Sequence, residues 1–136
     1  MDLATSMLVA ASGMRAQSSR MRTIAENIAN ANSTAPTAQS DPYRRKIPTM
    51  TSSFDRELNA TVVEAGRPVQ DSSDFRSQYD PGNPVADAKG YVKLPNVNSL
   101  VEIMDMREAQ QSYEANVNVL DASKTMLVRT IDLLNK

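Results

Sequence analysis

Proline is confined to the middle of this 136-residue chain. All seven prolines fall between residues 36 and 95, together with three of the four glycines, and the two ends are long proline-free tracts. Proline lacks an amide N–H and clashes with the preceding helical turn, so it is excluded from helix interiors. The distribution therefore predicts a mainly α fold, with a long helix at each end and an irregular region between them.

The first tract, roughly residues 3–31, has a heptad pattern. Two rows of residues repeat every seven positions, as in the seam of a coiled coil. One row is Met7, Met14, Met21 and Ile28, and the other is Leu3, Ala10, Gln17, Ile24 and Ala31. The pattern predicts a long helix with these rows on its inward face.

The last tract, roughly residues 98–135, repeats the heptad pattern. One row is Met106, Tyr113, Leu120, Leu127 and Leu134, and the other is Ile103, Gln110, Val117, Lys124 and Ile131. Helices that rise ~1.5 Å per residue fit a domain of this size only when they pack lengthwise. We therefore expect a coiled-coil-like antiparallel pair of helices with a small irregular or β-hairpin insertion between them.

Polar residues interrupt both seams, at Gln17, Gln110 and Lys124, and the first helix fills its seam with Met and Ala rather than Leu. Polar seam residues lower stability and select a partner, and Met adapts to irregular surfaces. The helices are therefore expected to pack within a larger assembly; an ordinary helical hairpin whose polar seam residues reach solvent is the alternative. The residues expected to pack the helices or the assembly are Met7, Met14, Met21, Ile24, Ile28, Tyr113, Val117, Leu120, Leu127, Ile131 and Leu134.

Three segments follow along the chain: an N-terminal helix over residues 1–32, a linker and small β-containing region over 33–97, and a C-terminal helix over 98–136. Residues 31–40 are small and polar without apolar periodicity, which is typical of a mobile linker. Short β-prone runs at 61–63 and 91–94 lie next to glycines, so the region is expected to contain a hairpin.

Composition excludes most kinds of active site. The chain has no Cys and no His, so it can form neither disulfides nor thiolate zinc sites, and it lacks the imidazole of the usual catalytic triads. Four aspartates in the middle region lack the spacing of a calcium loop and are expected to be solvated turn residues: Asp71, Asp74, Asp80 and Asp87. We therefore expect no catalytic, cofactor-binding or metal-binding residues, and no enzyme.

The charge pattern argues against nucleic acid. Fifteen basic and sixteen acidic residues leave a net charge of -1, and the one basic run is Arg44-Arg45-Lys46. This run either holds a carboxylate-bearing neighbour or guards an exposed edge strand with charge.

No window approaches the ~18 to 20 consecutive apolar residues that span a bilayer, so no membrane span is expected. The N-terminal residues lack a basic region and a long apolar run, so a cleaved secretory signal is not expected either.

Two blocks near the N-terminus, ASGMRAQ (residues 11–17) and IAENIANAN (24–32), resemble the N-terminal signature of bacterial flagellar rod and hook proteins. The blocks YRRK (43–46), YDPGNP (79–84), GYVKLPNVN (90–98) and YEAN (113–116) resemble the proximal-rod type in particular. Asn83 departs from that type, which often has His there, but Asn is itself a turn former. The signature residues expected in turns are Tyr79, Asp80, Pro81, Gly82, Pro84, Gly90, Tyr91, Pro95 and Asn96.

The resemblance implies a structural subunit of the basal-body rod, the drive shaft of the flagellum. It further implies export by the flagellar type III apparatus without signal cleavage, and helical polymerisation in the periplasm. The implied partners are further copies of the chain, rod proteins of the FlgB, FlgF and FlgG types, the rod-to-ring adaptor and the export gate. A helical secretion chaperone or adaptor is the alternative, followed by a small carboxylate-dependent enzyme.

Phe54 and Leu58 have the spacing F-x-x-x-apolar. This pattern resembles the gate-recognition element that early flagellar export substrates present to the secretion apparatus. An i,i+4 pair that stabilises one local helical turn is the alternative.

Overall fold

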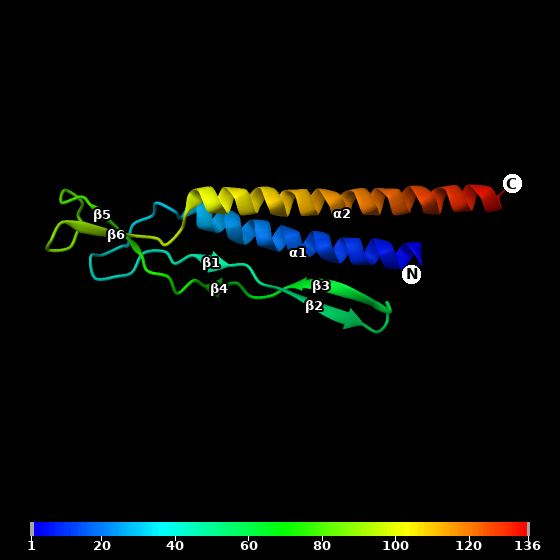
Figure 1. Ribbon diagram of the computed structural model, residues 1–136, viewed down its shortest axis with the longest axis horizontal. Coiled ribbons are helices and arrows are strands. Elements are labelled where there is room, and N and C mark those ends of the chain that lie inside the picture. The colour runs from blue at the N-terminus through cyan, green and yellow to red at the C-terminus, as the bar shows by residue number, and fades with distance from the viewer. Residues whose placement is uncertain (1, 136) are drawn as a thin grey trace. The chain divides into compact units, whose positions relative to one another are not determined.

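A computed structural model describes residues 2–135. It contains two long helices, α1 (Leu3–Ala29) and α2 (Ser99–Leu134), with short strands between them (Figure 1). Polar residues cap both helices: Asp2 Oδ1 accepts the Thr5 N–H at 2.7 Å, and Asn98 Oδ1 accepts the Leu100 N–H at 3.1 Å. The predicted fold class, two long packed helices with small hairpins between them, is confirmed.

The strands of the described residues form three two-stranded antiparallel sheets. The pairs are β1 (Lys46–Ile47) with β4 (Val69–Gln70), β2 (Met50–Asp55) with β3 (Ala60–Ala65), and β5 (Arg76–Tyr79) with β6 (Tyr91–Leu94). The β-prone runs at 61–63 and 91–94 thus lie in β3 and β6, as predicted. Within residues 2–135, neither helix is long and apolar enough to cross a membrane.

The chain divides into two compact units. The terminal unit contains α1 up to Met21, residues 49–67 with β2 and β3, and α2 from Arg107 onward. The middle unit contains residues 22–48 and 68–106, and therefore the end of α1, the start of α2 and the other four strands. Each unit draws on all three segments that the sequence predicts, and that division into segments remains a prediction.

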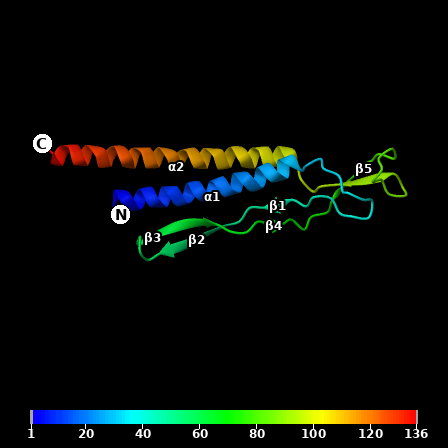
Figure 2. The ribbon, with the colours of Figure 1, turned by 180° about the vertical axis from the view of Figure 1, so that it is seen from behind.

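In the terminal unit, α1 and α2 run antiparallel. Gly13 lies against Asn116, and Arg20 Nη2 is 3.1 Å from Glu108 Oε2. The β2–β3 hairpin lies along α1 on a different side, as Figure 2 also shows. The buried residues are small and form a thin core: Ala10, Ser12, Ala16, Ala60, Val62, Ala109 and Ser123.

The middle unit buries larger groups. The largest fully buried side chains of the described residues all belong to it: Ile24, Glu102, Val97, Asn27 and Pro95. Two alanines of the expected linker, Ala31 and Ala35, are also buried, and Arg76 Nη2 donates to the Ala31 carbonyl at 2.8 Å. The linker segment therefore packs against the rest of this unit at Ala31 and Ala35, while most of its other residues are exposed.

Candidate functional site

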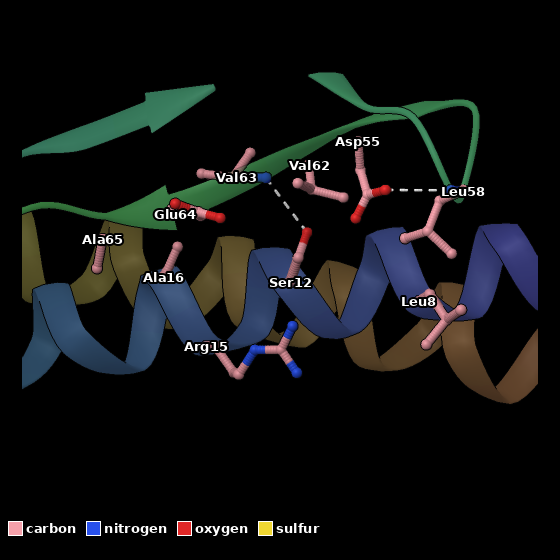
Figure 3. A pocket seen from close by; sticks show the side chains of 10 residues that line it. All are labelled: Leu8, Ser12, Arg15, Ala16, Asp55, Leu58, Val62, Val63, Glu64 and Ala65. Carbon is pink, nitrogen blue, oxygen red and sulfur yellow. Dashed lines mark hydrogen bonds between the residues drawn. The ribbon is translucent and has the colours of Figure 1, made fainter. Parts of the chain in front are cut away.

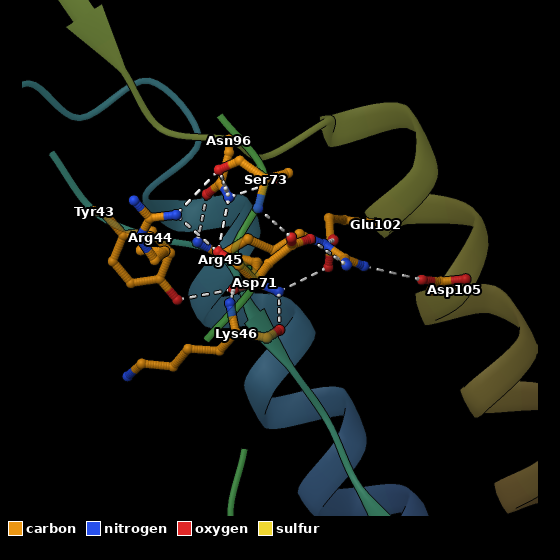
Figure 4. Close-up of polar contacts among 10 residues, drawn as sticks. Tyr43, Arg44, Arg45, Lys46, Asp71, Ser73, Asn96, Glu102 and Asp105 are labelled. Atoms are coloured by element: carbon orange, nitrogen blue, oxygen red, sulfur yellow. Dashed lines mark hydrogen bonds and ion pairs between the residues drawn. The ribbon is translucent and has the colours of Figure 1, made fainter. Parts of the chain in front are cut away.

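A buried carboxylate lies at the centre of the middle unit. The Glu102 side chain, in the first turn of α2, is only 1% exposed. Its Oε1 accepts Arg45 Nε–H at 2.5 Å and its Oε2 accepts Asn27 Nδ2–H at 3.0 Å (Figure 4). A buried charge is tolerated only when it is paired and hydrogen-bonded, and both oxygens of Glu102 meet this condition.

Asn27, near the end of α1, uses both ends of its amide. Its Oδ1 accepts the Tyr43 hydroxyl at 2.8 Å and the Lys46 N–H at 2.9 Å. Its Nδ2 donates to the Lys46 carbonyl at 2.8 Å as well as to Glu102. The side chain thus fastens the 43–46 segment to α1 with its hydrogen-bonding capacity satisfied.

Arg45 connects this pair to two further carboxylates, Asp71 at 3.3 Å and Asp105 at 3.8 Å. Burial disfavours its charged form, but the hydrogen bonds and charges of Glu102 and Asp71 outweigh burial and raise the pKa of Arg45. The Ser73 N–H and, secondarily, Arg45 lower the pKa of Asp71. The Arg45 N–H donates to Asn96 Oδ1 at 2.7 Å. We call these five residues the polar clasp: Asn27, Tyr43, Arg45, Asn96 and Glu102.

The polar clasp explains the basic run. Arg45 binds carboxylates, Lys46 Nζ pairs with Glu26, and Arg44 Nη1 donates to the carbonyls of Asp71 and Ser73. The prediction that the run holds carboxylate-bearing neighbours is confirmed for Arg45 and Lys46, whereas Arg44 binds backbone carbonyls instead. Sequence reasoning missed Asn27 and Glu102: an acidic residue in a first helical turn is ordinarily explained by the helix dipole.

The signature residues lie in and around β5 and β6, and the expectation that Tyr79 and Tyr91 lie in turns is wrong, because they are the last residue of β5 and the first of β6. Tyr79 and Tyr91 stack edge to face with centroids 5.3 Å apart. Gly90 has φ +83°, and a Cβ there would lie 2.9 Å from Tyr79 Cε2, so a side chain would be both strained and crowded. Asn83 Oδ1 accepts the Val85 N–H at 3.1 Å, which is a turn-forming contact. Asp87 Oδ1 likewise accepts the N–H groups of Lys89 and Tyr91.

Among residues 2–135, no cluster of three or more acidic residues is arranged to hold a metal ion. The carboxylates of Glu102, Asp71 and Asp105 are each paired with Arg45, so the arrangement fastens together the segments that carry them.

The residues that the sequence predicts to pack the helices differ in how far their side chains are exposed. Ile24 is buried, and five residues along both helices are half-buried in the chain: Met7, Met14, Met21, Ile28 and Tyr113. Val117 and Leu120 are also half-buried. Leu127, Ile131 and Leu134 are exposed, at 41%, 49% and 81%. Whether these residues serve assembly remains a prediction.

The inward face of α2 differs from the predicted one in the row that contains Gln110 and Lys124. Ala109 and Ser123 are buried, at seven-residue intervals from Asn116, which contacts Gly13. Gln110 and Lys124 were expected inward but are exposed, since they lie ~100° further around the helix. Small residues allow the two helices to approach closely, and no apolar pattern reveals them.

The exposed end of α2 has a simple cause. In an antiparallel pair of helices, the residue numbers of facing positions have a nearly constant sum. This sum is 129 for Gly13 and Asn116 and 128 for Arg20 and Glu108, so Leu3 lies opposite about residue 126. Helix α1 begins there, whereas α2 continues to Leu134 (Figure 1). Leu127 and Leu134 therefore continue the row of Leu120 where α1 no longer covers it. We call residues 127–134 the α2 overhang.

A groove lies between α1 and the β2–β3 hairpin in the terminal unit (Figure 3), with a cavity volume of about 430 Å³. Leu8, Leu58, Val62 and Ala65 give it apolar walls, and Ser12 Oγ accepts the Val63 N–H at 3.3 Å. We call it the hairpin groove.

The residues of the F-x-x-x-apolar pattern lie in this hairpin. Phe54 lies in β2 and is 60% exposed, whereas Leu58 lies in the turn that follows and is half-buried in the groove. Asp55 Oδ1 accepts the N–H groups of Glu57 and Leu58, which forms the turn. The alternative of an i,i+4 pair on a helical turn is therefore wrong.

Comparisons with known proteins find relatives that match nearly the whole chain. Residues 7–35 match the family model "Flagella basal body rod protein", and residues 88–133 match "Flagellar basal body rod FlgEFG protein C-terminal". The flagellar basal-body rod protein FlgC of Agrobacterium fabrum is 47% identical over 132 residues, which cover 97% of this chain and 95% of that protein. FlgC of Escherichia coli O157:H7 is 41% identical with 92% of each chain covered, and FlgC of Bacillus subtilis is 36% identical with 94% and 95% covered.

Proposed function

The chain belongs to the FlgC family of flagellar basal-body rod proteins, and from this membership we propose how it reaches the rod and which proteins it meets there. The family is structural, so the chain is a proximal-rod subunit of the flagellar basal body and not an enzyme. The predicted resemblance is confirmed, and the chaperone and enzyme alternatives are wrong. A rod protein assembles with other rod subunits.

We propose that the chain is exported unfolded by the flagellar type III apparatus, without signal cleavage, and polymerises helically in the periplasm. Its proposed partners are further copies of itself, rod proteins of the FlgB, FlgF and FlgG types, and the rod-to-ring adaptor. The absence of cysteine supports export through a narrow channel, because no disulfide can close a loop in transit. The thin alanine and serine core of the terminal unit supports it too, since such a core stabilises the isolated fold weakly.

The observation that carries the proposed polymerisation is the uncovered seam of α2. Leu127 and Leu134 continue a packed row without a covering helix, and Ile131 lies beside them, all three exposed. Covering a large aliphatic side chain contributes ~1.5 to 3 kcal/mol, which an isolated chain forgoes. An assembly of helices recovers this free energy.

We propose that the export gate recognises Phe54 and Leu58 before the chain folds. Half-burial of Leu58 in the hairpin groove supports this order, because the pair is fully accessible together only in an unfolded chain. Replacing both residues by alanine should lower the amount of secreted protein while the cellular amount stays unchanged. The matched control replaces the exposed Ser52 and Ser53 by alanine and should be secreted normally. Equal secretion of both variants would contradict the recognition role.

Fractionation tests the function as a whole. A tagged chain that restores motility to a strain lacking it should be found in isolated basal bodies. Recovery of the chain only as a small cytoplasmic oligomer bound to another export substrate would contradict the proposed route and would instead match a chaperone.

A further inference from the structure

We infer that the α2 overhang of one copy of this chain docks into the hairpin groove of a second copy. The inference rests on the proposed polymerisation and names the contact that would extend it. Both surfaces belong to the terminal unit, and each is left open within a single chain.

The α2 overhang is an apolar ridge. Leu127, Ile131 and Leu134 recur at intervals of four and three residues, so they share one side of the helix. This side continues the seam that α1 covers further along α2, which is already a helix-packing surface. An occupant that covers the ridge therefore extends an existing interface.

The hairpin groove is the matching apolar surface. Outside α2, the exposed large hydrophobic residues of the terminal unit, within residues 2–135, are Leu8 and Phe54. Leu8 lines the groove, whereas Phe54, which pairs with the exposed Thr61, lies on the opposite face of the hairpin. The groove thus combines the exposed Leu8 with apolar walls from Leu58, Val62 and Ala65, and this is the apolar surface that a second copy offers to the ridge.

One chain cannot make this contact with itself. By the pairing of Gly13 with Asn116, Leu8 lies opposite about residue 121, so Ile131 lies ten residues further along α2. Ten helical residues correspond to ~15 Å. The groove also lies on the side of α1 that carries Ser12, ~100° around the helix from Gly13. The ridge must therefore reach the groove of another molecule.

Charges at the two surfaces are compatible. Arg15 and Glu64 line the groove, with Asp55 near its turn end. The overhang carries Arg129 and Asp132 beside the apolar ridge. Each surface thus has one basic residue to meet an acidic residue of the other.

The contact joins two different surfaces and is heterologous. Each molecule uses its overhang on one neighbour and offers its groove to another, so repetition produces an open helical polymer or a closed ring rather than a two-fold dimer. A rod requires such a propagating contact.

Disulfide cross-linking tests the contact, and the native chain has no cysteine to interfere. Leu8→Cys and Ile131→Cys are made as two separate variants. They are co-expressed in cells that lack the native chain, and restored motility shows that the variants are assembled. Oxidation of isolated basal bodies should give a disulfide-linked dimer only when both variants are present. Each variant alone should remain monomeric, because a heterologous contact does not bring identical positions together.

The matched control pairs Leu8→Cys with Gln111→Cys, an exposed position of α2 outside the overhang, and should give no dimer. Leu134→Cys replaces Ile131→Cys if the latter is not incorporated. Variants that enter basal bodies but do not cross-link, or that cross-link to a different rod protein, would overturn the inference and leave the proposed function intact. Absence of the native chain itself from basal bodies would instead refute the proposed function.

Discussion

The two units of this chain are stabilised by opposite means. The middle unit buries Glu102 and Asn27 and satisfies them through Arg45, Tyr43 and the backbone of Lys46. The terminal unit buries alanines, serines and one valine, and exposes its large aliphatic residues at the α2 overhang. The middle unit is thus held by a satisfied polar network, whereas the terminal unit is held by a thin core of small residues. Both units expose large apolar side chains, Leu100 and Met104 in the middle unit and Leu133 and Leu134 in the terminal unit.

This difference separates a unit that depends on specific polar partners from a unit that depends on a small apolar contact area. A satisfied buried network tolerates only its own partners, because any missing partner leaves a polar group unpaired. A thin core of small residues holds two helices in register but buries little apolar area. The signature residues of the 43–46 and 90–98 blocks accordingly meet in the polar clasp and not on the overhang.

The largest effect is expected from Arg45→Met. The substitution leaves Glu102 buried without its cationic partner, which typically costs ~3 to 5 kcal/mol. Hydrogen exchange of the isolated chain should lose protection in the middle unit. Lys93→Ala, which removes a pair whose side chains are 59% and 64% exposed, is the control and should leave protection unchanged.

A double variant sharpens this prediction. Adding Glu102→Met to Arg45→Met removes the unpaired buried charge, and replacing a buried ion pair by apolar residues is often neutral. The protection of the middle unit from hydrogen exchange should therefore largely return. If the double variant were as unprotected as Arg45→Met, the charge pairing assigned to Glu102 would be wrong.

The next largest effect concerns Leu120 and Ile131, which the structure places on either side of the start of α1. Leu120→Asp puts a carboxylate into a half-buried position of the helix pair, so it should lower the helicity of the isolated chain and abolish motility. Ile131→Asp should abolish motility with unchanged helicity, because Ile131 is uncovered in the single chain.

Asp121→Ala, at an exposed position of α2, is the matched control and should swim nearly normally. Normal motility of cells that carry Leu120→Asp would contradict the packing of Leu120 within the helix pair. The comparison would also fail if Ile131→Asp reduced helicity as much as Leu120→Asp, since circular dichroism would then show that the overhang is covered within one chain.

Sequence predicted the helices and the role of the basic run because their signals are local. Absence of proline marks α1 and α2 without knowledge of their neighbours, and three adjacent cations predict carboxylate partners. The identity of the partner was not predictable, since Glu102 lies 57 residues from Arg45 and only the fold brings them together.

The α2 seam shows a second limit. Its apolar row, which includes Leu120 and Leu127, was found by periodicity, but the row of Ala109, Asn116 and Ser123 was not, because small and polar residues leave no apolar signal. Which residues of the apolar row are covered depends on where α1 begins opposite α2. That register is a tertiary property.

A smaller effect is expected from Gly13→Ala. A Cβ at Gly13 would lie 2.8 Å from Asn116 Nδ2, so the two helices must shift or Asn116 must turn away. Overpacking typically costs ~1 to 3 kcal/mol, partly offset by the ~1 kcal/mol that alanine gains over glycine in a helix. Urea denaturation should show a modest net loss, which Asn116→Ala in the same chain relieves. Gly82→Ala, where a Cβ meets no atom closer than 3.8 Å, should be neutral.

The smallest expected effect is a pH dependence confined to the middle unit. Burial, and then the negative charges of Glu26 and Glu102, raise the pKa of Tyr43 to about 12. Unfolded tyrosine ionises near ~10, so the folded state holds this proton more tightly and its contribution to stability is complete below pH ~10. As the pH rises from ~10 towards 12, the unfolded chain ionises first and stability falls.

Tyr43→Phe lacks this titration and also the hydrogen bond to Asn27, so it should start less stable and lose less stability over the same interval. Hydrogen exchange at paired pH values, corrected for intrinsic rates, should show the difference between the two proteins in residues 22–48 and not in the terminal unit. An equal loss in Tyr43→Phe would show that Tyr43 ionises freely in the fold, and the polar clasp would then be less tightly closed than its contacts indicate.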